Sequence, residues 1–301
     1  MNWKLKAAIQ LGLAYAPFGE RINYALQKIK GSHSPANVDR SIPDIVAALA
    51  LASNYVKLKG STVVEIGTGW VPTNTILLYL AGASRIYTYD HVPHLRLEGT
   101  QLCVEQLMRR LPLVSEAFKI AESVVAAKLQ LLQTTSLAKL LERAGIVYHA
   151  PADASQTGLL AGSIDLVCSY AVLEHVPEKV VHALVVESKR ILKASGVSVH
   201  AIGLHDHYAS DDPRLSLVNF LKYPEWQWRL IAKNRVHYQN RLREKHYFQL
   251  LESHGAKLLE SRHRVEERDV KAAAKMHIDR RFHGLSPDEL AVQYTEIVYA
   301  F

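Results

Sequence analysis

The sequence VVEIGTGWVP occupies residues 63–72. It joins a short, continuous apolar run to a turn with two glycines, and a helical segment follows over residues 71–80. A short apolar run that ends at a turn is typical of a strand buried on both faces. Glycine in such a turn lets the backbone approach a ligand closely, because no Cβ intrudes. The stretch therefore predicts the first strand, turn and helix of an α/β sheet whose ligand lies at the turn.

Further short apolar runs alternate with helical segments along the chain. The predicted strands cover 62–66, 85–89, 146–149, 164–169, 197–202, 257–261 and 293–301. The predicted helices cover 3–30 with a break at Pro17, 45–57, 71–80, most of 99–145, 178–193 and 247–254. Alternation of this kind predicts a doubly wound, mostly parallel, seven-stranded Rossmann-like sheet with helices on both faces.

Two regions fall outside this alternation. Residues 1–58 are predicted to form an N-terminal helical extension, and residues 59–301 the α/β domain. Within that domain the aromatic, basic stretch 204–246 follows the fifth strand. Because ligands bind at the carboxyl edge of parallel strands, we interpret this stretch as a cap insert over the ligand.

Composition limits the class of protein. Of 301 residues, 49% are hydrophobic and 22% charged, as in ordinary globular proteins. Cys103 and Cys168 stand far apart and predict two buried thiols in a reducing compartment. Neither a membrane span nor a cleavable signal is recognised, so we expect a cytoplasmic protein. The net charge of +7 is expected to reflect mainly a solvated surface, although it would also attract phosphate groups, nucleic acid or anionic lipid.

The glycine turn and later carboxylates indicate the kind of cofactor. Pro72 stands where a nicotinamide fingerprint has its third glycine, and the carboxylate of Glu65 lies where a pyrophosphate would sit. A cofactor with a cationic amino group and a sulfonium tolerates that carboxylate. Asp90 ends the second strand and can accept hydrogen bonds from both ribose hydroxyls. Asp153 follows the third strand, where a carboxylate can accept from an adenine amino group.

These motifs together resemble the class I S-adenosylmethionine-dependent methyltransferases of the type 11 small-molecule group. The resemblance covers residues 60–203 and includes the run Leu173-Glu174-His175-Val176 after the fourth strand. It departs from the family pattern at Val71 and Pro72. The implied cofactor is S-adenosylmethionine. The residues that the resemblance places at the cofactor are Glu65, Gly67, Thr68, Gly69, Asp90, His91, Asp153, Ala154 and Ser169.

Methyl transfer to a hydroxyl group needs alignment and a base, and histidine titrates near neutral pH. The sequence Leu204-His205-Asp206-His207-Tyr208 directly follows the fifth strand. We predict His207, then His205, as the base, with Asp206 orienting one imidazole. The alternative is an ordinary polar loop.

Glu174-His175 raises the question of a metal. In ubiquinone-pathway and small-RNA methyltransferases a similar segment has an extra Glu three residues earlier and binds a divalent metal. Alanine stands there in this chain, at position 171. The sequence therefore predicts no metal, although His205 or His207 could complete a site.

The cap resembles that of bacterial methyltransferases of unassigned substrate. Its Tyr223, Trp226, Trp228 and Tyr238 could stack on a sugar or another ring, or could pack the cap onto the core. Arg241 and Arg243 could bind phosphate or carboxylate.

The leading hypothesis is O-methylation of a small molecule or glycan precursor. A nucleic-acid (RNA) methyltransferase is the second hypothesis, disfavoured because no RNA-binding module or base-methylating motif is present. A non-catalytic protein that binds the cofactor or touches a membrane surface through its N-terminus is the third.

Overall fold

The computed structural model describes all residues except 1, 20–21, 24–25, 27–33, 233 and 235. A single sheet of seven strands runs through the molecule in the order β3-β2-β1-β4-β5-β7-β6. The strands are β1 (Thr62–Ile66), β2 (Arg85–Tyr89), β3 (Ile146–His149), β4 (Ile164–Tyr170), β5 (Leu192–Gly203), β6 (Lys257–Arg264) and β7 (Tyr294–Ala300). The first five pair in parallel, and β7 pairs antiparallel with both β5 and β6. This topology confirms the predicted mostly parallel, doubly wound sheet.

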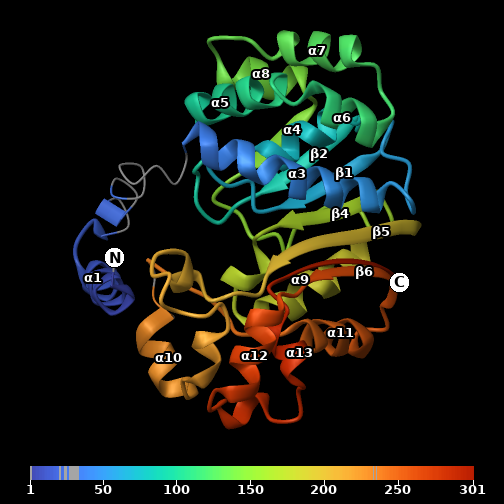
Figure 1. The fold of residues 1–301 in the computed structure, drawn as a ribbon. Helices are drawn as coiled ribbons and strands as arrows, with labels where there is room; N and C mark the ends of the chain where they lie inside the picture. The colour runs from blue at the N-terminus through green and yellow to red at the C-terminus, as the bar shows by residue number, and fades with distance from the viewer. Residues whose placement is uncertain (1, 20–21, 24–25, 27–33, 233, 235) are drawn as a thin grey trace.

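Helices cover both faces of the sheet, as predicted (Figure 1). One face packs against the apolar sides of α3 (Pro35–Ala52), α4 (Thr73–Leu80), α5 (Leu97–Met108), α6 (Leu111–Phe118), α7 (Glu122–Leu131) and α8 (Leu137–Arg143). The opposite face packs against α9 (Glu178–Ile191) and α11 (Glu244–Ser253). No helix among the described residues has both the length and the apolar character needed to cross a bilayer.

Two element boundaries differ from the prediction. The helix predicted from residue 45 begins at Pro35, because Ser34 caps its N-terminus by accepting from the Asn37 N–H. It ends at Ala52, before the predicted residue 57. Ser195 and Gly196, which lie between the predicted helix 178–193 and the predicted strand 197–202, are instead part of β5, which begins at Leu192. Pairing with β4 overrides the local turn signal there, and a Cβ on Gly196 would lie 2.9 Å from the Ile164 carbonyl oxygen.

The N-terminal helix α1 (Trp3–Tyr15) ends before Pro17, as predicted, and packs on α10 (Glu225–Ala232) of the cap. The second N-terminal helix, predicted up to residue 30, lies largely outside the described residues. In contrast to α1, α3 is part of the main core beside the sheet, although the predicted extension of residues 1–58 includes both.

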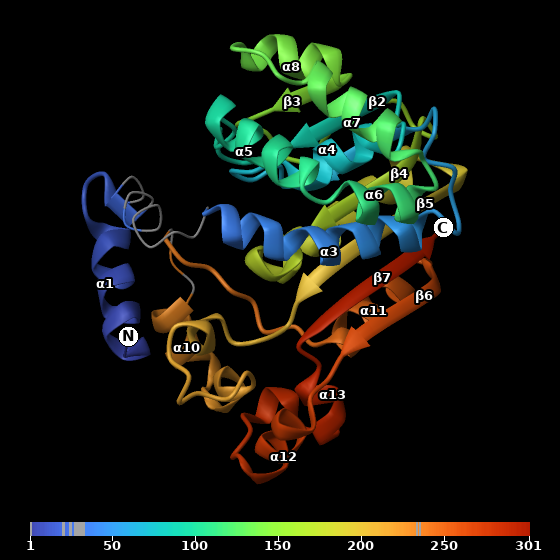
Figure 2. The same cartoon turned by 45° about the horizontal axis from the view of Figure 1, so that its top comes forward.

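The cap consists of two separate chain segments (Figure 2). The predicted insert supplies η2 (His207–Ser210), η3 (Asn219–Lys222) and α10. The second segment supplies α12 (Glu267–Lys275), η4 (Arg280–Phe282) and α13 (Pro287–Ala291). The two segments share one apolar cluster that includes Phe220, Trp228, Phe282 and Leu290. The sequence analysis assigned the second segment only as a polar helical connection, because its few apolar residues are spread among many charges.

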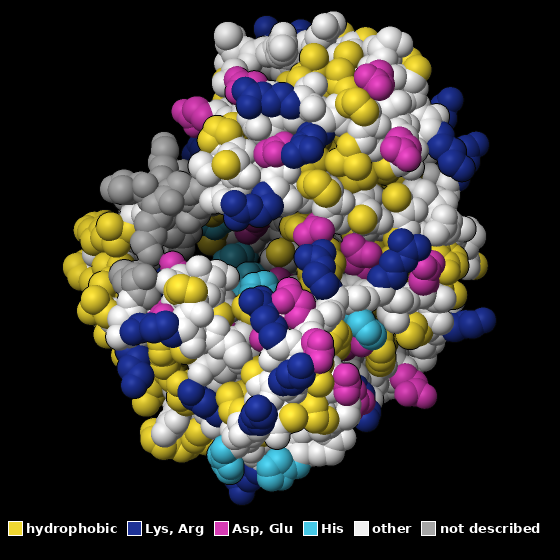
Figure 3. Space-filling view, in the orientation of Figure 1, with side chains coloured by type: hydrophobic (Ala, Val, Ile, Leu, Met, Phe, Trp, Pro, Cys, Tyr) yellow, Lys and Arg dark blue, Asp and Glu magenta, His cyan; other side chains and the backbone are white. Residues whose placement is uncertain are grey.

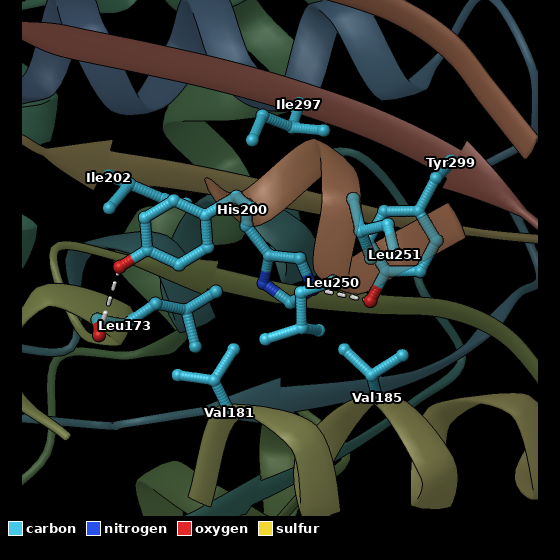
Figure 4. A pocket seen from close by; sticks show the side chains of 10 residues that line it. Leu173, Val181, Val185, His200, Ile202, Leu250, Leu251, Ile297 and Tyr299 are labelled. Atoms are coloured by element: carbon cyan, nitrogen blue, oxygen red, sulfur yellow. Dashed lines mark hydrogen bonds between the residues drawn. The ribbon is translucent and has the colours of Figure 1, made fainter. Parts of the chain in front are cut away.

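An apolar pocket beneath β5 encloses a histidine (Figure 4). His200 is 4% exposed, and its two ring nitrogens contact the hydroxyls of Ser169 at 2.7 Å and Tyr299 at 3.1 Å. The surrounding side chains are aliphatic or aromatic: Leu173, Val181, Val185, Ile202, Tyr247, Leu250, Leu251 and Ile297. Burial lowers the pKa of His200 to about 4. The folded protein therefore holds this imidazole neutral.

This histidine predicts a loss of stability in mild acid. In the unfolded chain His200 binds a proton below about pH 6.5, whereas in the folded chain it stays neutral down to about pH 4. The free energy of unfolding should therefore fall as the pH drops through this window, with a contribution of at most about 3 kcal/mol from this group. Urea unfolding of the wild type and His200→Gln between pH 4 and 7 measures the difference.

The glutamine variant should have a flatter pH dependence, whatever its stability at pH 7. The matching change at an exposed site, His283→Gln, should leave the wild-type slope. Equal slopes for all three proteins would contradict the assignment.

Candidate functional site

The glycine turn after β1 lies at the carboxyl edge of the sheet. Gly67 donates its N–H to the Tyr89 carbonyl at 2.8 Å, and its φ of +82° is a conformation that favours glycine. A Cβ at Gly67 would lie 2.4 Å from the side chain of Val172. Gly69 also has positive φ, at +67°, but a Cβ there would meet no atom within 4 Å. At Gly67 the turn packs against Val172, which follows β4. At Gly69 the turn leaves space in which a ligand has room.

Glu65 supports this turn from the interior. Its carboxylate is 1% exposed and accepts hydrogen bonds from Asn74, Thr75 and Thr88. Burial raises its pKa, and these three donors oppose the shift. The hydroxyl of Thr68 is held in turn by Thr88, at 2.6 Å. The side chains of both predicted cofactor residues therefore bond within the protein and fix the position of the loop.

Asp90 connects the second strand to the glycine turn. One carboxylate oxygen accepts the Gly69 N–H at 2.9 Å, and the other accepts the Val92 N–H at 3.2 Å and contacts the ring of His91 at 3.2 Å. Burial would raise the pKa of Asp90, but the hydrogen bonds from His91, Gly69 and Val92 hold it below its ordinary value. The group is a carboxylate at neutral pH, directly beside the open glycine.

The loop after β3 reaches the same place. Ala152 donates its N–H to the Asp90 carbonyl at 2.9 Å. Asp153 is exposed, and its carboxylate accepts from the backbone and hydroxyl of Ser155. Ala154 is half-buried. Of the predicted cofactor residues, Gly69, Asp90 and Asp153 thus lie on three adjoining loops at one edge. A carboxylate beside an open glycine fits a ribose, and this edge can hold the predicted cofactor.

Ser169 lies elsewhere than expected. Its hydroxyl is 4% exposed and contacts His200 beneath the sheet. The side chain that contacts the glycine turn is that of Val172, which lies just after β4. Ala171, just before it, has a φ of +53°, a strained conformation for alanine that turns the chain toward η1 (Leu173–His175).

The loop after β5 carries the predicted base. Burial lowers the pKa of His205, and burial together with neighbouring histidines lowers that of His207. His205 Nδ1 contacts the Gln293 carbonyl at 3.4 Å, so Nδ1 carries the proton and Nε2 the lone pair. The ring of His207 makes no hydrogen bond with any residue that the structure describes.

The expectation that Asp206 orients an imidazole is wrong. Its carboxylate is 1% exposed and accepts from the Tyr208 N–H and the Asn219 side chain. It caps the short helix η2 instead, because an aspartate just before a helix bonds to its free backbone N–H groups. Burial raises the pKa of Asp206 to about 6.

Histidines from separate segments gather around Glu174. The ring of His207 lies 4.9 Å from that of His175, 5.2 Å from His205 and 6.1 Å from His237, between centroids. Glu174 is 3% exposed; one carboxylate oxygen accepts the Gly203 N–H at 2.9 Å, and the other has no partner within the described chain. Figure 3 shows histidine side chains at the floor of the hollow between the sheet and the cap.

Two cap residues that the sequence analysis missed hold this group together. Gln239, which is 1% exposed, donates to the His205 carbonyl at 2.6 Å and accepts from the His207 N–H at 3.3 Å. Asn240 bonds through its backbone to Glu174 and through its side chain to the carbonyls at both ends of η1. Gln239 thus fixes the β5 loop and Asn240 fixes the turn after β4. A Gln-Asn pair in a polar stretch gives no signal of this role.

The structure corrects the ligand-binding role predicted for the cap. Arg241 and Arg243 are 1% and 0% exposed, and donate mainly to backbone carbonyls. Trp228 is fully buried and bonds to the Gln239 carbonyl, whereas Trp226 is 64% exposed. These arginines and Trp228 therefore pack the cap onto the sheet, because the terminal guanidinium nitrogens and the indole N–H bond inside the protein.

The chain was compared with known protein families, curated proteins and solved structures. Residues 113–199 match a family model described as a methyltransferase domain, which leaves the glycine turn and the histidine loop outside the matched range. No curated protein matches the chain.

Several solved structures are similar. Geranyl diphosphate C-methyltransferase from Streptomyces coelicolor A3(2) is 12% identical, with 84% of this chain and 78% of that chain covered and a TM-score of 0.44. A putative sarcosine dimethylglycine methyltransferase from Galdieria sulphuraria is 15% identical, with 87% and 85% covered and a TM-score of 0.46. A putative methyltransferase from Haloferax volcanii, in complex with the activator Trm112, is 18% identical, with 87% and 92% covered and a TM-score of 0.44.

The open space at Gly69 predicts a selective effect of one methyl group. Gly69→Ala should weaken binding of S-adenosylhomocysteine, because the new Cβ enters the space left for the ligand. Such overpacking costs about 1–3 kcal/mol, or roughly 10–100-fold in Kd. Isothermal titration calorimetry measures the affinity.

Gly162→Ala is the matched control. Gly162 has a nearly equal φ of +63° and equally open space, but lies before β4 at the opposite edge of the sheet. Both variants should lose similar stability, about 1–2 kcal/mol from the left-handed conformation. Equal affinities in both variants would mean that no ligand binds over Gly69.

Proposed function

We propose that the chain is an S-adenosylmethionine-dependent methyltransferase, which the methyltransferase-domain match over residues 113–199 supports, and that it methylates an oxygen atom of a small molecule or glycan precursor. The proposal is supported by one arrangement: the open glycine turn with its carboxylate lies at the same sheet edge as a group of histidines, of which His175 is exposed and His205 and His207 are half-buried. The two are linked through Val172, which contacts Gly67 and directly precedes η1 with Glu174 and His175.

When bound, S-adenosylmethionine supplies a methyl group already activated by its sulfonium. The protein then has to align the acceptor, exclude water and take up the hydroxyl proton. We assign the cofactor contacts to Gly69, Asp90 and Asp153, and the base to His207 or His205. The methyl group would pass to the acceptor oxygen with S-adenosylhomocysteine as the leaving group, and the imidazole of His207 or His205 would take up the hydroxyl proton.

The acceptor is proposed to lie between the sheet edge and the cap. This part of the molecule is lined by imidazoles and closed by the cap, whose two arginines are already used in its interior. Arg241 and Arg243 are not available to a phosphate or carboxylate of the acceptor, because they bond to backbone carbonyls. The free, buried thiols of Cys103 and Cys168 support a cytoplasmic location.

A panel of acceptors tests the function. The purified protein is incubated with methyl-labelled S-adenosylmethionine and with phenols, sugars, hydroxy acids or carboxylic acids, and label transfer is measured. Transfer to oxygen is expected for one of these classes, and Asp90→Ala should abolish it by weakening cofactor binding. Transfer only to nitrogen or carbon acceptors, or to RNA, would overturn the proposal.

Replacement of the histidines tests the base. His205→Ala and His207→Ala should each be examined on the true acceptor, and loss of the base should lower kcat by roughly 10²–10⁴-fold. Affinity for S-adenosylhomocysteine should stay near that of the wild type, because the cofactor contacts lie on the first three loops. Added imidazole should partly restore the rate of the variant that lacks the base. Near wild-type rates in both variants would exclude both histidines.

A further inference from the structure

We propose that Glu174, His175 and His207 form a binding site for a divalent transition-metal ion, at the place where the acceptor oxygen binds. This inference rests on the proposed function for the role of the ion, but not for its binding. It replaces the sequence-based expectation of metal-independent catalysis. That expectation followed from Ala171, and the observed group does not use position 171.

The three side chains offer one donor atom each, and these atoms all lie within 4.8 Å of one another. Metal–ligand bonds of about 2.0–2.2 Å place neighbouring donor atoms roughly 3–4 Å apart. His175 is exposed, so a small rotation of its side chain is enough to close the site. The ligands come from η1 and from the start of η2, both at the carboxyl edge of the sheet.

The environments of Glu174 and His175 fit a metal site. One carboxylate oxygen of Glu174 is buried and has no partner among the described residues. Burial of an acceptor without a partner costs free energy, and a bound cation or a hydrogen-bond donor would offset that cost. The other oxygen of Glu174 is held by the Gly203 N–H. His175 Nδ1 contacts the Tyr238 carbonyl at 3.0 Å, so Nδ1 donates its proton and Nε2 carries a lone pair. Such outer hydrogen bonds are what orients metal ligands.

The donor set indicates the kind of ion. Two imidazoles and one carboxylate suit Zn²⁺ or Fe²⁺, whereas Mg²⁺ prefers oxygen ligands. A site with three protein ligands keeps a coordination position open, as in catalytic zinc sites. An acceptor hydroxyl in that position would lose its proton more readily, because a bound cation stabilises the oxyanion. His207 is then a ligand, and His205 with its free Nε2 is left as the proton acceptor.

Metal binding can be measured without turnover. The full-length protein is treated with a chelator and then titrated with Co²⁺, followed by visible absorption, and with Zn²⁺ and Mg²⁺ by calorimetry. We expect one Co²⁺ or Zn²⁺ per chain, and no comparable binding of Mg²⁺. Glu174→Gln and His207→Asn should each weaken Zn²⁺ binding by roughly 100-fold or more.

His205→Ala is the matched control, because His205 is adjacent to His207 but lies outside the proposed ligand set. It should bind Zn²⁺ as the wild type does. Circular dichroism and S-adenosylhomocysteine affinity establish that each variant is folded. The proposal is overturned if the wild type binds neither Co²⁺ nor Zn²⁺, or if both ligand variants bind as the wild type does. Metal binding without cofactor binding would instead refute the proposed function and leave the site intact.

Discussion

The segment 239–243 enters the interior between the sheet and the cap, and its side chains bond to backbone groups of elements far apart in the chain. Gln239 holds the loop after β5, and Asn240 holds the turn after β4. Arg241 binds carbonyls around η3, and Arg243 binds carbonyls before η2 and around α13. Buried polar groups must find partners, so the position of this segment constrains every element that it touches. The geometry of the histidine group depends on it.

Glu65 has a similar structural role near the glycine turn, where the cofactor is proposed to bind. Its buried carboxylate joins β1 to β2 and α4 through hydroxyl and amide donors. Neither Glu65 nor the segment 239–243 has its buried side chains free for a ligand. Glu65, Arg241 and Arg243, which the sequence analysis took for ligand-binding candidates, bond within the protein instead. The site is therefore built from two separately fixed halves that meet at Val172.

The sequence predicted the sheet because its strands are short apolar runs, a signal that local composition carries. It also predicted which loops meet, since the carboxyl ends of parallel strands lie at one edge. The sequence-based predictions were wrong where contacts between distant parts of the chain determine the local structure or the role of a side chain. Ser195 and Gly196 favour a turn by their residue types, but pairing with β4 includes them in β5. Arg241 and Arg243 are buried, and they therefore bond to backbone carbonyls and not to a ligand. Asp206 caps the short helix η2 and does not orient a histidine ring as predicted. The meeting of Glu174 and His175 with His207 depends on folding of the cap, which no local pattern encodes.

The two-part construction of the cap has a consequence for how such a protein can diversify. Its segments, 204–246 and 265–291, are separated along the chain by α11 and β6, which belong to the sheet. Their shared apolar cluster means that neither segment can be exchanged alone without leaving half of an interior exposed to water. Recombination at a single loop would therefore give insoluble chimeras. Under the proposed function, new acceptor preferences are more accessible through point substitutions on the inner wall of the cap.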